Sequence, residues 1–127
     1  MRIVLDTNRY SDMARGDAAA CRTIETSEQA FLPFVVLAEL RAGFLGGNRA
    51  KKNEAALNVF LRRPPVSVLW PDAATTFQYA ALFQQLAEQG RMIPTNDIWI
   101  AALTVQHGLT LYARDQHFAH LPQLMRI

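Results

Sequence analysis

The sequence predicts an α/β fold in which helices cover both faces of a central parallel sheet. Short apolar runs recur along the chain, helix-length segments separate them, and no internal repeat or linker interrupts the alternation. This alternation is typical of parallel strands, which need a crossover connection between them. A length of 127 residues corresponds to one domain. We therefore expect a single three-layer α/β/α sandwich over residues 1–127.

The predicted strands are short runs in which β-branched and other apolar residues dominate. They are residues 2–5, 30–32, 66–70 and 109–113, with a last short strand expected in LMRI at 124–127. Ligands of open parallel sheets bind beyond the carboxyl ends of the strands. Residues that directly follow these runs are therefore candidates for a functional site.

Helical periodicity and capping residues define the segments between the strands. The predicted helices are residues 17–28, 34–47, 48–63, 71–90 and 95–108. Asp17 and Asp72 occupy N-cap positions, and Gly90 is a C-terminal stop signal. The stretch from 6 to 16 forms a further helix only if Asp6 caps the segment TNRYSDMA.

Composition restricts the class of protein. Cys21 is the single cysteine, so no intrachain disulfide is possible, and we expect a reducing, cytoplasmic location. No apolar run approaches the roughly 18 residues of a membrane span. The chain enters a predicted strand at once, so we expect neither a targeting segment nor a membrane association.

The basic residues are mostly arginine, eleven of the thirteen, although the net charge is only +2. Arginine has a planar fork of donors that suits phosphate oxygens. Residues 41–63 carry six basic residues and one acid, Glu54. This stretch fits either a nucleic-acid contact or the solvated surface of a helical hairpin, and charge alone leaves both interpretations open.

Four acidic residues stand apart from the other seven. Capping or solvation accounts for Asp12, Asp17, Glu25, Glu28, Glu54, Asp72 and Glu88. The remaining acids follow predicted strands or lie in apolar helical segments: Asp6, Glu39, Asp97 and Asp115. Each also has a local explanation, namely an N-cap, a helix edge, a first-turn acid favoured by the helix dipole and a turn residue. Their joint placement makes a shared site the stronger hypothesis.

A divalent cation would resolve the repulsion within such a cluster. Buried carboxylates without partners are prohibitively unfavourable. A donor set of oxygens, without histidine or cysteine, fits Mg²⁺ or Mn²⁺ rather than Zn²⁺. Such ions activate water in phosphodiester hydrolysis. We therefore predict Asp6, Asp97 and Asp115 as ligands, with Glu39 holding a second ion or orienting the water.

Four motifs in order, IVLDTN, LAELRAG, NDIWIAA and LYARDQHF, resemble the PIN-domain family, and more narrowly its VapC-type ribonuclease toxins. The resemblance extends from Ile3 to Phe118. It implies a PIN fold and Mg²⁺- or Mn²⁺-dependent cleavage of single-stranded or looped RNA. It carries the family's acidic residues onto Asp6, Glu39, Asp97 and Asp115, and Asn8 matches a polar residue that orders the site.

The resemblance also implies partners: a homodimer and a small antitoxin whose C-terminal segment lies over the active groove. One departure is Ala113, which stands where the family usually has a Thr or Ser before the last acid. One hydroxyl is thereby absent from that corner of the site. Arg9, Arg41 and Arg114 are candidates for holding RNA phosphates, and each is equally compatible with an ordinary surface arginine.

Other functions fit the sequence less well. A phosphoacceptor receiver domain needs a lysine after a late strand, and the only lysines are Lys51 and Lys52. A haloacid-dehalogenase phosphatase needs Asp-x-Asp, whereas this chain has DTN at 6–8. His117 and His120 are interpreted as surface or packing residues. Two alternatives remain open: a PIN nuclease that processes RNA, and a PIN-type domain that binds RNA without cutting it.

Overall fold

Four strands form one parallel sheet in the order β3-β2-β1-β4. The computed structural model describes residues 1–127. The strands are β1 (Arg2–Leu5), β2 (Gln29–Pro33), β3 (Val66–Leu69) and β4 (Thr110–Tyr112). In the centre of the sheet, Ile3 is in register with Ala30 on one side and Thr110 on the other. The predicted parallel sheet is confirmed.

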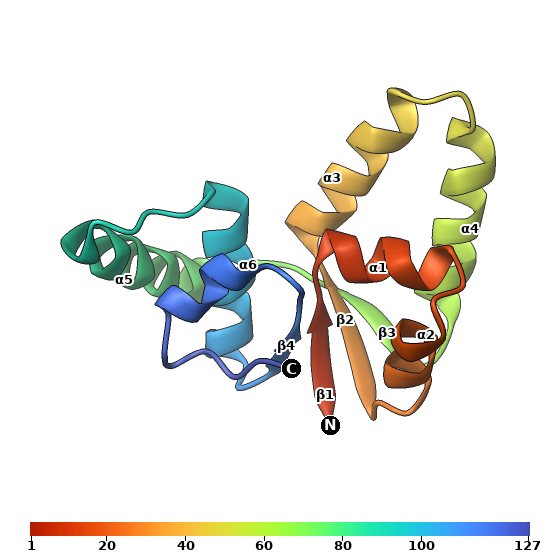
Figure 1. Ribbon diagram of the computed structural model, residues 1–127. Coiled ribbons are helices and arrows are strands. Elements are labelled where there is room, and N and C mark those ends of the chain that lie inside the picture. Colours follow the sequence, from red (N-terminus) through yellow and green to blue (C-terminus); the bar gives the residue numbers. More distant parts are fainter.

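Helices lie on both sides of this sheet, as Figure 1 shows. They are α1 (Thr7–Ala14), α2 (Ala18–Glu25), α3 (Phe34–Leu45), α4 (Ala50–Arg62), α5 (Ala73–Gln89), α6 (Thr95–Gln106) and the 3₁₀ helix η1 (Gln116–His120). The chain steps from β1 to β2 to β3 in one direction and then returns across the sheet to β4. Because crossovers are right-handed, that reversal sends α5 and α6 to the face opposite α1 and α2. No helix has the length and apolar character needed to cross a membrane.

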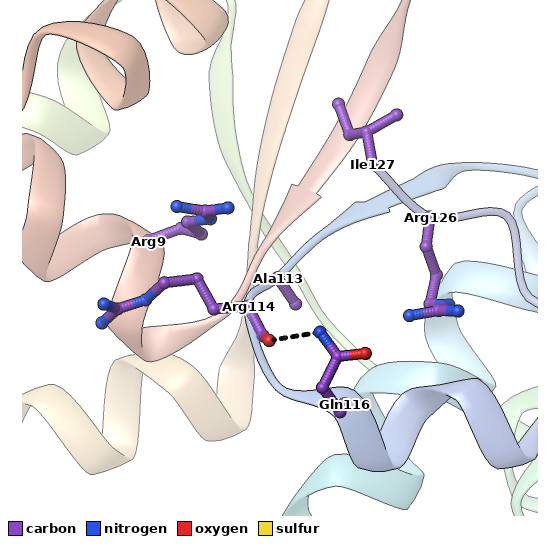
Figure 2. A pocket seen from close by; sticks show the side chains of 6 residues that line it. All are labelled: Arg9, Ala113, Arg114, Gln116, Arg126 and Ile127. Atoms are coloured by element: carbon purple, nitrogen blue, oxygen red, sulfur yellow. Dashed lines mark hydrogen bonds between the residues drawn. The ribbon is translucent and has the colours of Figure 1, made fainter.

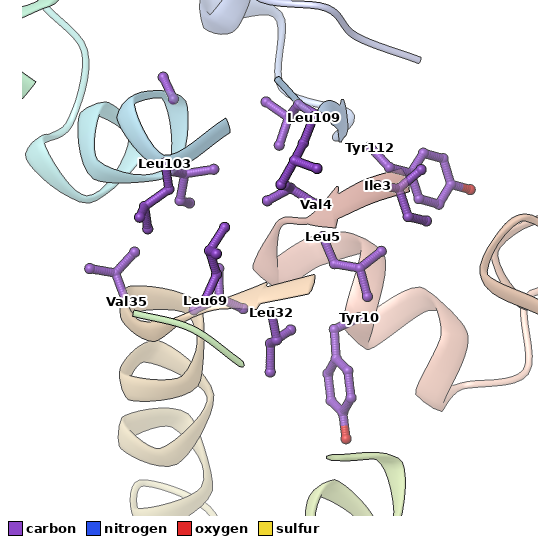
Figure 3. Packing of buried hydrophobic residues seen from close by; sticks show 14 of the residues in the cluster. Ile3, Val4, Leu5, Tyr10, Leu32, Val35, Leu69, Leu103, Leu109 and Tyr112 are labelled. Carbon is purple, nitrogen blue, oxygen red and sulfur yellow. The ribbon is translucent and has the colours of Figure 1, made fainter. Parts of the chain in front are cut away.

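The core forms around β1, whose side chains alternate between the two helical layers. Ile3, Val4 and Leu5 are each at most 1% exposed. In Figure 3, Val4 is directed toward Leu103 and Leu109, whereas Leu5 is directed toward Tyr10. Because β1 is buried on both faces, it fixes the position of Asp6, the residue that follows it.

One conditional expectation is met, and one expected strand is absent. Residues 6–16 contain a full helix, α1, because the side chain of Asp6 accepts a hydrogen bond from the backbone N–H of Arg9. The strand expected at 124–127 is wrong, since only an isolated bridge between Leu111 and Arg126 forms there. A proline at 122 and a tight turn leave this segment too short for a strand.

Candidate metal-dependent active site

The candidate site lies where strand order reverses. Strands β1 and β4 are neighbours in the sheet, but their crossover helices lie on opposite faces, so the carboxyl ends of these strands open onto a crevice. Asp6 directly follows β1, and Asp115 follows β4 by three residues. The backbone N–H of Asp6 donates to the carbonyl of Tyr112 at 3.4 Å, which ties the two strand ends together.

Asp6 has two simultaneous functions. One carboxylate oxygen caps α1 by accepting from the N–H of Arg9 at 2.8 Å. The residue is nevertheless buried, with only 5% of its surface exposed, and it lines the pocket that contains the other acids. The cap interpretation and the site interpretation of Asp6 are therefore both compatible with the structure.

Glu39 and Asp97 reach the same pocket from helices. Glu39 lies in the middle of α3, and its carboxylate accepts a hydrogen bond from the Thr7 hydroxyl at 3.3 Å. Asp97 lies in the first turn of α6. The apolar residues that follow it, Ile98 and Ile100, are at most 1% exposed and anchor that helix. A helix anchored in this way holds the Asp97 carboxylate rigidly.

The acids predicted from the sequence thus surround one pocket of about 180 Å³. Its lining is Asp6, Thr7, Asn8, Glu39, Asp97, Ile100, Asp115 and Phe118. Asn8 is exposed and lines the rim, where the sequence placed the residue that orders the site. Asp6 and Asp97, which are 91 residues apart along the chain, meet here because of the topology.

Burial and mutual repulsion raise the pKa values of three of these carboxyls. Burial is the largest cause for Asp6, and the charge of Asp97 adds to it. The pKa of Glu39 rises for the same two reasons, and the Thr7 hydrogen bond opposes the rise. Burial also raises the pKa of Asp97, which His117 counteracts. The charges of Arg9 and Arg114 oppose the rise at Asp6, but burial outweighs them, and a bound cation would add further compensating charge.

His117 is the site residue that the sequence interpretation missed. Its Nδ1 lies 2.9 Å from Oδ1 of Asp115. Its Nε2 lies 2.6 Å from Oδ2 of Asp97, at ion-pair distance but without a well-formed hydrogen bond. The expectation of an acid cluster without histidine is therefore wrong. The signal was its position two residues after Asp115, where the 3₁₀ helix η1 turns the imidazole back over the pocket.

Asp12 also differs from its prediction as a solvated helix-surface acid. It is 9% exposed and lies among three guanidinium groups. Arg9 and Arg114 each approach its Oδ2 at 3.4 Å, and Arg15 approaches its Oδ1 at 3.2 Å. Of the predicted RNA-contacting residues, Arg9 and Arg114 therefore lie next to the acidic pocket. The third, Arg41, pairs with Glu54 across the α3–α4 hairpin.

The donors in the pocket fit a divalent ion. Asp97, Asp115 and His117 each offer a ligand atom, and these three atoms lie within 4.8 Å of one another. Asp6 and Glu39 add carboxylate oxygens on the same pocket. Carboxylate-rich sets suit Mg²⁺ and Mn²⁺. Because burial raises the pKa values of Asp6, Glu39 and Asp97, a bound cation would displace protons from these three carboxyls.

The sequence matches the PIN domain family over residues 3–124. The chain belongs to the PIN-domain family. This PIN domain is 30% identical over 92 residues to ribonuclease VapC2 of Rickettsia felis, which covers 72% of this chain and 67% of the relative. It is 32% identical over 125 residues to VapC ribonuclease Y4jK of Sinorhizobium fredii. That match covers 89% of this chain and 86% of the relative. The VapC-type resemblance stated from the motifs is confirmed.

Solved structures agree with this assignment. The PIN domain superposes on a chain of VapBC2 from Rickettsia felis, bound to a promoter DNA fragment, with a TM-score of 0.89 and 25% identity over 100% and 98% of the two chains. It superposes on VapBC-5 of Mycobacterium tuberculosis, of the VapBC family of toxin–antitoxin systems, with a TM-score of 0.76 and 28% identity over 100% and 98%. The predicted α/β sandwich of PIN type is therefore confirmed.

Proposed function

We propose that this PIN domain is an Mg²⁺- or Mn²⁺-dependent endoribonuclease that cleaves single-stranded or looped RNA as the toxin of a toxin–antitoxin pair. The observation that carries the proposal is the single pocket shared by Asp6, Glu39, Asp97 and Asp115. The VapC ribonucleases among its relatives support the same activity. A bacterial cytoplasm, reducing and rich in RNA, is the proposed place of action.

The residues divide the chemistry between them. A bound divalent ion would lower the pKa of a water molecule and offset charge on the phosphodiester. Asp6, Asp97 and Asp115 would hold the ion, and the exposed Glu39 would hold a second ion or orient the attacking water. Its hydrogen bond from Thr7 fixes one oxygen and leaves the other free to accept a proton. Asn8 at the rim would order the waters at the entrance.

Two protein partners belong to the proposal. The first is an antitoxin, supported by the VapBC toxin–antitoxin complexes that share this fold. The second is another copy of the chain. Phe77 and Phe83 on α5 are 78% and 40% exposed, and Glu88 is the only charged residue of that helix. Exposed aromatic side chains on a helix with few charges favour burial against a second copy of the same surface.

The test is the Asp97→Asn variant, assayed for cleavage of bacterial RNA with Mn²⁺. We expect a loss of at least ~100-fold in rate, because a neutral amide is a poor ligand for a hard cation. Cleavage at the wild-type rate would contradict the mechanism. The circular dichroism spectrum serves as the folding control, and Asp72→Asn, which changes an exposed acid far from the pocket, is the matched variant.

Two other functions are compatible with the same fold. An RNA-binding PIN domain without nuclease activity would retain RNA but release no fragments in Mn²⁺. A processing nuclease would cleave RNA without arresting growth, and its gene would have no neighbouring antitoxin frame. Because all four acids line one pocket, the structure favours cleavage over binding alone.

A further inference from the structure

A second pocket, lined by arginines, lies beside the acidic one. It has a volume of about 440 Å³, and its lining is Arg9, Ala113, Arg114, Gln116, Arg126 and Ile127. Figure 2 shows Arg9 and Arg114 on one side of Ala113, with Gln116 and Arg126 on the other. Arg114 and Gln116 flank Asp115 in the chain, so the two pockets meet at the end of β4.

Arg9 is held in place before any ligand arrives. Its guanidinium carbon lies 4.3 Å from the centre of the Tyr112 ring, and its Nη1 lies 3.4 Å from Asp12. Its Nε is buried and has no hydrogen-bond partner. A buried donor without a partner is unfavourable, so an acceptor that reached it would be stabilised.

Positive charge exceeds negative charge in this pocket. Asp12 is the carboxylate that faces Arg9 and Arg114, and it is shared with Arg15 as well. Arg126 makes no ion pair or side-chain hydrogen bond in the structure. The charge of Asp6 also acts on Arg9 and Arg114. The four guanidinium groups of Arg9, Arg15, Arg114 and Arg126 outnumber these two carboxylates, so the pocket attracts anions.

Arg126 is positioned by its backbone rather than by its side chain. The N–H of Leu111 donates to the carbonyl of Met125 at 2.8 Å, and the N–H of Ile127 donates to the carbonyl of Leu111 at 2.9 Å. These two bonds dock the segment onto β4 and leave the guanidinium free over the pocket. Replacing the side chain therefore leaves the docking bonds intact.

We propose that this arginine pocket binds a phosphate of the RNA strand next to the bond that is cut, and that Arg126 is one of its contacts. The proposal rests on the proposed nuclease function, since it assigns a subsite to that substrate. Arg9 and Arg114 line one side of the pocket and Arg126 the other, and a guanidinium group has the fork of donors that suits phosphate oxygens. The adjoining acidic pocket would repel a phosphate unless a cation neutralised it, so the two pockets act on successive parts of one strand.

The experiment measures RNA binding without cleavage. A short fluorescent single-stranded RNA of mixed sequence is titrated in EDTA by fluorescence anisotropy over a range of KCl concentrations. We expect Arg126→Gln to weaken binding about tenfold and to reduce the slope of log affinity against log salt by about 0.7, the value for one phosphate contact on a single strand. Arg22→Gln, on the exposed surface of α2 outside the pocket, removes the same charge and should leave both quantities at the wild-type value.

Two further arms make the outcome decisive. RNA with a 5′-phosphate and RNA with a 5′-hydroxyl separate a terminal phosphate from an internal one: a defect confined to the phosphorylated RNA assigns the pocket to the strand end. Equal weakening by Arg22→Gln, or no change in Arg126→Gln, would overturn the proposal. A parallel cleavage assay in Mn²⁺ keeps the two hypotheses apart, because absent cleavage contradicts the nuclease and not the Arg126-dependent binding.

Discussion

Asp6 and Asp72 have the same local position and opposite electrostatics. Each caps a helix, Asp6 accepting from the N–H of Arg9 at 2.8 Å and Asp72 from the N–H of Thr75 at 3.1 Å. Asp72 is exposed, and hydrogen bonds from Gln106 and then Thr75 lower its pKa. Burial raises the pKa of Asp6. Good capping geometry therefore does not distinguish a structural acid from a site acid, whereas the surroundings do.

The difference lies in what surrounds the carboxylate beyond its cap. Three groups donate hydrogen bonds to Oδ1 of Asp72, two from Thr75 and one from Gln106, and its carboxylate is also exposed to solvent. Asp6 has only the Arg9 amide, and it shares its pocket with three further acids. A buried carboxylate that lacks donors is unfavourable alone and becomes favourable with a cation.

The largest expected effect is stabilisation by metal. We expect Mn²⁺ at about 100 times its dissociation constant to increase the free energy of unfolding by roughly 2.7 kcal/mol, since the ion binds the folded state. Asp6→Asn should abolish most of this increase, and Asp72→Asn should retain it. Thermal unfolding with Mn²⁺ and with EDTA measures the difference. An equal response from both variants would place the ion elsewhere.

Without metal, the same pair of variants should differ in stability. Asn caps a helix as well as Asp does, so Asp6→Asn keeps the hydrogen bond from Arg9 and removes a buried charge. We expect a gain of about 1 kcal/mol, or roughly 4 °C in melting temperature. Asp72→Asn should lower the melting temperature slightly at neutral pH, because the cap survives but the charge that accepts hydrogen bonds from Gln106 and Thr75 is lost. A lower melting temperature for Asp6→Asn in EDTA would show that the buried Asp6 charge does not destabilise the folded protein.

The smallest effect is the dependence of this gain on pH. The pKa of Asp6 is raised on folding, so the native state binds its proton more tightly than the unfolded state does, and stability falls as pH rises from about 4 through the raised pKa. The advantage of Asp6→Asn should therefore vanish below pH 4 and reach its full size above the raised pKa.

The contribution of Asp72 to stability changes with pH in the opposite direction to that of Asp6. The pKa of that carboxyl is lowered on folding, so the stability it contributes is present at neutral pH and is lost on acidification. Melting curves of the two variants and the wild type across this pH range test both signs. If the melting temperatures of all three proteins changed with pH in parallel, the opposite pKa shifts of Asp6 and Asp72 would be contradicted.

Much of the fold was predictable because each signal was local. The strand RIVL, the caps Asp17 and Asp72 and the glycine stop at Gly90 all act over a few residues, and the structure shows each of them. The acidic cluster was predictable from strand-end positions, since parallel strands bring their carboxyl ends to one edge. The catalytic roles of Asp6, Glu39, Asp97 and Asp115 stay predictions that the variants above test.

Features that depend on tertiary contacts were not predictable. Asp12 looks like any polar residue of α1, and only the fold brings Arg9, Arg15 and Arg114 to it. His117 contacts Asp97 across a separation of 20 residues. In both cases a short polar segment contains no periodic pattern that would indicate its partners.

The ligands of the acidic pocket differ in how firmly the backbone holds them. Asp6 is fixed by a buried strand and by its bond to Tyr112, whereas Glu39 projects from an exposed position on α3. Mg²⁺ demands near-ideal octahedral geometry, and larger cations tolerate irregular shells. We therefore expect the freedom of α3 to shift to influence which cation the pocket prefers.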